Sequence, residues 1–91
     1  MTGKKSNIIT LNVDGVELSF EPNRTAYNSL INEMTMTNKI APVVTYLGRI
    51  VVPESKDALN QLMEKYPSVE LQIVESVNSV YSPKVEIEIK N

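Results

Sequence analysis

The sequence predicts an α+β fold in which an N-terminal β-hairpin and a C-terminal strand form a small three-stranded sheet, packed by three to four intervening helices. Two observations predict the sheet: an Asp-Gly dipeptide between two alternating apolar segments, and a third alternating segment near the C-terminus. A third observation, helical spacing of the apolar residues between them, predicts the helices. Because 91 residues suit one small core, we expect residues 1–91 to form a single domain, with residues 1–6 as a disordered tail.

The hairpin is the most local of these signals. Asp14-Gly15 separates two segments in which apolar and polar residues alternate, and a type I′ turn requires positive φ at both central positions. A two-residue loop places Val13 opposite Val16, and the same register pairs Leu11 with Leu18 and Ile9 with Phe20 on one face.

The C-terminal segment repeats the alternating pattern. Val85, Ile87 and Ile89 alternate with charged residues, which is typical of a half-buried strand. Two strands alone are marginally stable in water, so we expect this segment to join the hairpin as a third strand. The sequence leaves open which edge of the sheet it takes.

Four helical segments are expected between the hairpin and the last strand. Asn23 is expected to cap the first, Pro42 to lie in the first turn of the second and Pro53 to end it, and Ser55 and Ser68 to cap the third and fourth. The apolar positions expected to face inward, in chain order, are Tyr27, Leu30, Ile31, Met34; Val43, Leu47, Ile50, Val51; Leu59, Leu62, Met63; and Val69, Ile73, Val77, Val80.

Composition excludes several classes of function. The chain has no cysteine and no histidine, which removes disulfides, thiolate and imidazole metal sites, cysteine nucleophiles and histidine acid–base catalysis. Nine Lys and Arg against eleven Asp and Glu give a net charge of −2, without a basic field for nucleic acid or anionic lipid. We therefore expect no catalytic residues, cofactor or metal, and no nucleic-acid or membrane partner. A cytoplasmic location is expected because no apolar run is long enough for a membrane span and the first six residues lack a signal-peptide core.

Some apolar side chains exceed what so small a core requires. They lie on or beside the helical segments and have two interpretations: core packing around the sheet, or a groove for a protein partner or a second copy of the chain. The candidate partner contacts are Tyr46, Ile50, Met34, Met36 and Tyr66.

The middle of the chain resembles a family of small phage tail assembly chaperones. The resemblance rests on Phe20-Glu21-Pro22 leading into Ala26–Met34, on Asn38-Lys39-Ile40-Ala41-Pro42, and on Tyr46-Leu47. The motif residues with expected structural roles are Tyr27, Asn28, Asn32, Asn38, Lys39 and Pro42. Asn38 is expected to close a helix in the left-handed conformation and Pro42 to begin the next. Asn28 and Asn32 share a helix face, where they either bond to a neighbouring segment or face solvent.

The resemblance implies a non-enzymatic role in the bacterial host cytoplasm during virion assembly. Members of the family are expected to keep the tape measure protein soluble, to help recruit the major tail protein, and to be absent from the finished particle. Two alternatives remain open: a structural component of the tail, and a small regulatory or inhibitory protein-binding domain of a mobile element.

Overall fold

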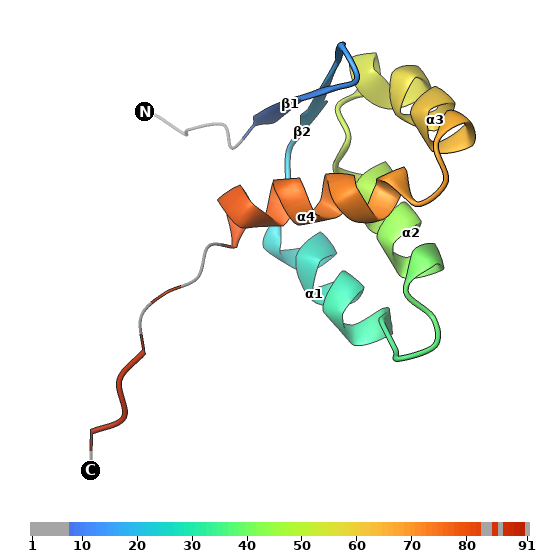
Figure 1. The fold of residues 1–91 in the computed structure, drawn as a ribbon. Coiled ribbons are helices and arrows are strands. Elements are labelled where there is room, and N and C mark those ends of the chain that lie inside the picture. Colours follow the sequence, from blue (N-terminus) through green and yellow to red (C-terminus); the bar gives the residue numbers. More distant parts are fainter. Residues whose placement is uncertain (1–7, 83–84, 86, 91) are drawn as a thin grey trace.

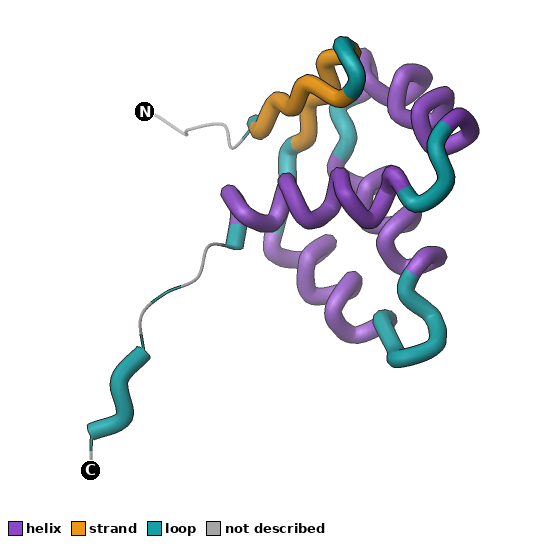
Figure 2. The backbone as a smooth tube through the Cα atoms, in the orientation of Figure 1, coloured by secondary structure: helices purple, strands orange, loops and turns teal. Residues whose placement is uncertain are grey.

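A β-hairpin at one end of the molecule is followed by four α-helices (Figures 1 and 2). The computed structural model describes residues 8–82, 85 and 87–90. The expected disordered tail, residues 1–6, lies outside this range. The elements in chain order are β1 (Ile9–Val13), β2 (Val16–Phe20), α1 (Arg24–Glu33), α2 (Ile40–Ile50), the short 3₁₀ turn η1 (Pro53–Ser55), α3 (Lys56–Lys65) and α4 (Val69–Tyr81).

The hairpin forms as predicted. β1 and β2 pair antiparallel, with Val13 opposite Val16, Leu11 opposite Leu18, and Ile9 opposite Phe20. Asp14 and Gly15 have φ values of 54° and 80°, as a type I′ turn requires. Since one face of the hairpin is apolar, this register places Leu18 and Phe20 fully in the core.

The predicted third strand is not present among the described residues. The sheet there has two strands, and Val85 and residues 87–90 are not in a strand. Val85, Ile87 and Ile89 are exposed. Lys84 and Glu86, which the prediction also included, lie outside the described residues. The prediction depended on a pairing partner far away in sequence, which alternation alone does not specify.

The outer edge of β2 is covered by the segment that follows α2. The N–H of Glu21 donates to the carbonyl of Ile50 at 2.7 Å, and the N–H of Val52 donates to the carbonyl of Ser19 at 3.0 Å. Phe20 and Val51 form an isolated antiparallel bridge. α2 therefore ends at Ile50, and the backbone becomes extended at Val51, where the chain meets the sheet. The expectation that Pro53 ends the helix is wrong, because the helix ends before Pro53 is reached.

The core lies between the hairpin and the helices. α1 packs against α2, α2 against α4, and α4 against β1. Asn23 caps α1 as predicted, because its side chain accepts a hydrogen bond from the N–H of Ala26 at 2.8 Å. The buried apolar side chains are Leu18, Phe20, Ala26, Leu30, Val43, Tyr46, Leu47, Ile50, Leu59, Leu62, Val69, Ile73 and Val77. Within the part of the chain that the structure describes, no helix has the length and apolar character to cross a membrane.

Two residues expected to face inward are exposed instead. Ile31 follows the buried Leu30 by one position, which is about 100° around the helix, and it points to solvent. Val80 is likewise exposed, because the last turn of α4 packs Tyr81 against Tyr27, with ring centroids 5.8 Å apart.

The two predicted serine caps lie at the N-cap positions of α3 and α4, but neither side chain makes a capping hydrogen bond. Ser68 precedes α4 in the left-handed region, with φ 68°, and its side chain makes no cap hydrogen bond. Ser55 precedes α3 and makes no cap bond either. Its hydroxyl oxygen instead accepts a hydrogen bond from the N–H of Ser19 in β2. The Ser55 hydroxyl therefore bonds to a partly buried N–H of the sheet and not to an N–H of the α3 terminus.

Candidate functional site

Tyr46 and Ile50, two of the five predicted partner contacts, lie in the core. They are 1% and 2% exposed, respectively. The hydroxyl of Tyr46 donates to Oδ1 of Asn78 at 3.3 Å and thereby connects α2 to α4. Burial raises the pKa of Tyr46 to about 12, and the nearby Tyr81 and Tyr27 hydroxyls add to the shift. A partner reaches neither Tyr46 nor Ile50 while the core is intact, so a partner surface consists of other residues.

Tyr27 joins three helices. Its ring meets that of Tyr46 edge-on, with centroids 6.4 Å apart and an interplanar angle of 71°. It also packs against Tyr81, and its hydroxyl donates to Oγ of Ser82 at 3.3 Å. Edge-to-face aromatic pairs contribute about 0.5–1.5 kcal/mol beyond the area they bury. Tyr27 thus holds α1 against α2 and the end of α4.

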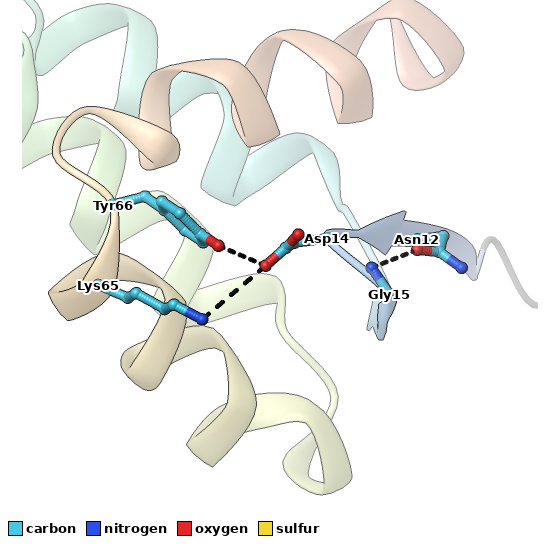
Figure 3. A network of polar contacts seen from close by, with 5 residues as sticks. All are labelled: Asn12, Asp14, Gly15, Lys65 and Tyr66. Atoms are coloured by element: carbon cyan, nitrogen blue, oxygen red, sulfur yellow. Dashed lines mark hydrogen bonds and ion pairs between the residues drawn. The ribbon is translucent and has the colours of Figure 1, made fainter.

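Tyr66 connects the end of α3 to the hairpin turn (Figure 3). Its ring is half-buried, and its hydroxyl donates a hydrogen bond to the carboxylate of Asp14. Nζ of Lys65 lies 4.0 Å from Oδ2 of the same carboxylate. On the other side of the turn, Oδ1 of Asn12 accepts from the N–H of Gly15 at 2.9 Å. In this geometry Tyr66 positions the hairpin.

The turn between α1 and α2 differs from the expectation for Asn38. Met34 ends α1 in extended backbone, with φ −74° and ψ 136°, so the helix needs no left-handed residue to close it. Asn38 is not among the described residues with positive φ. Thr35 closes the turn: its N–H donates to the carbonyl of Asn38 at 3.1 Å, and its Oγ1 accepts from the N–H of Asn38 at 2.9 Å.

The other motif residues lie around the same two helices. Lys39 precedes α2, and its carbonyl accepts from the N–H of Val43 at 3.2 Å. Pro42 is buried in the first turn of α2, as predicted. Asn28 and Asn32 are both exposed on α1, which agrees with the solvent-facing alternative.

Four apolar side chains remain exposed on α1, on α2 and in the turn that joins them. Met36 is 90% exposed in the turn, and Ile31 is 53% exposed in the last full turn of α1. Ile40 and Val44 are exposed on α2, where a spacing of four places them on one stripe. We call these four residues the α1–α2 patch. The predicted contact Met36 belongs to it, whereas Met34 is half-buried against the core.

Ile31, Ile40 and Val44 were not among the predicted contacts, although the sequence carries a signal for two of them. Ile40 and Val44 form a second apolar stripe on α2, beside the buried Val43 and Leu47. A helix that packs on one side needs one apolar stripe, so the second one indicates a further contact. Ile31 gives no such signal, because its spacing from Tyr27 is the one that places two residues on the same face of a helix, and the sequence therefore predicts it to be buried.

Charged side chains of opposite sign border the α1–α2 patch. Glu33 and Lys39, at the two ends of the turn, are both exposed. A polar rim around an apolar centre is typical of protein–protein interfaces. Elsewhere, a hollow of about 510 Å³ is lined by Arg24, Arg49 and Tyr81 among others. Among the described residues, no group of three or more His, Cys, Asp and Glu is placed to hold a metal ion.

Comparison with known proteins gives two matches. The model of a family described as phage tail assembly chaperone matches residues 9–91, a range that begins at the first residue of β1. A protein of Haemophilus phage HP1 (strain HP1c1), named "Uncharacterized 11.3 kDa protein in lys 3'region", is 35% identical over 91 residues, which cover 100% of this chain and 88% of that protein. No solved structure matches the chain.

Proposed function

This chain belongs to the phage tail assembly chaperone family, and we propose that it acts without catalysis, binding the tape measure protein, the major tail protein or both while the virion tail assembles in the host cytoplasm. One observation carries the proposal: the four apolar side chains of the α1–α2 patch are exposed on two helices, and in the turn between them, although both helices already bury other apolar residues in the core. Exposed apolar side chains that gather in one region of a surface mark interaction sites.

The composition of the patch suits an apolar helical partner. A helix buries apolar residues at i, i+3, i+4 and i+7 when it docks on another apolar surface. Ile40 and Val44 offer such a stripe, while Met36 is unbranched and adapts to irregular surfaces. Glu33 and Lys39 at its border give a rim that favours neither charge sign in the partner.

The size of the patch favours reversible binding. Full burial of one fully exposed Val, Ile or Met side chain contributes about 1.5–3 kcal/mol. The four give less than four times that amount before any cost, because Ile40 and Val44 are already more than half covered. Association itself costs about 4–15 kcal/mol in lost freedom. A single patch of four residues therefore holds a partner weakly, which suits a protein that must release its client during assembly.

The test is co-expression of this chain with the tape measure protein of the same phage, followed by size-exclusion chromatography. The proposal predicts that the tape measure protein stays soluble and co-elutes with the chain. If the tape measure protein aggregates as it does alone, and the chain elutes separately, it is not a tape measure chaperone. The same experiment with the major tail protein tests the second partner.

Mass spectrometry of purified particles separates the chaperone from a structural tail component. A chaperone is absent from the finished tail, whereas a structural component is present in it. A regulatory protein of a mobile element would be absent too, but its removal would leave tail assembly intact.

A further inference from the structure

β1 has an open outer edge. Among the described residues β1 pairs only with β2, and the other edge of β2 is covered by Val51 and Val52. Monomeric proteins protect such edges with charged residues, proline or bulges. Residues 9–13 read Ile-Thr-Leu-Asn-Val and contain none of these. The edge is therefore suited to pairing with another strand.

A segment with the complementary pattern lies outside the core. Val85, Ile87 and Ile89 are 72%, 80% and 84% exposed. Alternation of period two gives this segment one apolar face, and burial of that face requires a neighbouring strand. Figure 1 shows residues 87–90 extending away from the sheet and the helices.

The segment and the edge match in length and in face. β1 has five residues, and residues 85–89 provide five. In antiparallel pairing with Leu11 opposite Ile87, the inward face of β1 is extended by Val85, Ile87 and Ile89. A hollow of about 320 Å³ lies on this side, lined by Leu11 and Val13 from β1 and by residues of α4. The side chains of the added strand would fill it.

We propose that two copies of this chain exchange the C-terminal segments that carry Val85, Ile87 and Ile89, each of which pairs antiparallel with the β1 edge of the other copy. The exchange gives each sheet a third strand and buries the exposed apolar row. It forms a two-fold symmetric dimer, because each copy gives the same segment and receives it at the same edge.

The path of the chain favours a second copy over pairing within one chain. α4 runs in the opposite direction to β1 in Figure 1, and the two elements line one hollow together. A segment returning from the end of α4 would therefore run parallel to β1 after a link of only Ser82, Pro83 and Lys84. Short hinges favour exchange between copies, and antiparallel pairing is slightly more stable per residue.

Charge also favours the β1 edge over pairing of two C-terminal segments with each other. Thr10 and Asn12, on the outward face of β1, are uncharged, so Glu88 meets no like charge there. Two C-terminal segments paired antiparallel about Ile87 would set Glu88 opposite Glu86, and directly opposed like charges destabilise a sheet.

Cysteine pairs in the full chain test the exchange directly, because the chain contains no cysteine of its own. A tagged Thr10→Cys chain is mixed with an untagged Glu88→Cys chain in mild denaturant, refolded and oxidised. The proposal predicts a disulfide-linked dimer of mixed mass, joined through positions 10 and 88. Asn60→Cys, on the exposed surface of α3, replaces Thr10→Cys as the control and should give no mixed dimer with Glu88→Cys.

A double cysteine variant distinguishes pairing within one chain from exchange between two copies. Parallel return of the segment would set Glu88 near Asn12, so an Asn12→Cys/Glu88→Cys chain would then form an internal disulfide and remain monomeric, which overturns the proposal.

Light scattering supplies the independent measurement. The unmodified chain should have twice the monomer mass of 10.2 kDa. Ile87→Lys should restore the monomer mass with an unchanged circular dichroism spectrum, whereas a monomeric unmodified chain would exclude exchange.

Discussion

The backbone N–H of Ser19 donates a hydrogen bond of 3.0 Å to the hydroxyl oxygen of Ser55. Ser19 lies in β2 and Ser55 ends η1, so this bond crosses from the hairpin to the start of α3. Ser55 is buried, and its hydroxyl satisfies an edge N–H of β2. The Ser55 side chain thus supplies the hydrogen-bond acceptor that a neighbouring strand would otherwise supply to the N–H of Ser19.

Ser55→Ala should lower the free energy of unfolding by about 1–2 kcal/mol, because it leaves a partly buried N–H without an acceptor. Urea unfolding followed by circular dichroism measures the change. Ser76→Ala is the matched control, since Ser76 is exposed in the middle of α4. Equal effects of the two substitutions would mean that the Ser19–Ser55 bond contributes nothing.

Ile50→Ala should lower the free energy of unfolding by about 2–5 kcal/mol, the range for truncating a buried aliphatic side chain. Ile31→Ala removes the same atoms from an exposed position and should cost far less. Urea unfolding of both variants checks this. A small loss for Ile50→Ala, with the fold retained, would return Ile50 to the candidate partner contacts.

Gly48→Ala should stabilise the protein. Gly48 is exposed within α2, and a Cβ built there meets nothing within 4 Å. Glycine in a helix interior costs about 0.5–1 kcal/mol relative to alanine, so the substitution should raise the free energy of unfolding by that amount. A lower melting temperature for Gly48→Ala would show that this position requires the backbone conformational freedom of glycine.

The raised pKa of Tyr46 predicts a loss of stability in alkali. The unfolded chain ionises Tyr46 near its ordinary pKa of 10, whereas the folded chain keeps the proton up to about pH 12. Between these values the unfolded state holds fewer protons, so the free energy of unfolding falls as pH rises. Urea unfolding between about pH 9 and pH 12 should show a steeper fall for the unmodified protein than for Tyr46→Phe. Parallel curves would contradict the shift.

Local signals in the sequence predicted local structure well. The Asp14-Gly15 turn contains the information for its own register, because a two-residue loop fixes which residues face each other. Asn23 could be recognised as a cap for the same reason, since its partner Ala26 is three residues away.

Features that depend on distant residues were not predictable in this way. Ser55 looks like a helix cap until β2 is placed beside it, and the N–H of Ser19 then takes its hydroxyl. Ile31 has the helical spacing that predicts a buried position. It is exposed because the packing of neighbouring helices sets how wide the buried stripe of α1 is. Tyr46 and Ile50 could not be assigned to core or surface, because both interpretations require an apolar residue at helical spacing. The α1–α2 patch became visible only once the packed faces of both helices were known.

The most direct test of the α1–α2 patch compares two substituted chains in the co-expression experiment. Met36→Ser/Ile40→Ser alters the patch without touching the core, and Val80→Ser alters an exposed valine on α4. The patch variant should lose co-elution with the tape measure protein while keeping its melting temperature, and Val80→Ser should keep co-elution. If the patch variant still solubilises the tape measure protein as well as the unmodified chain does, the partner binds elsewhere.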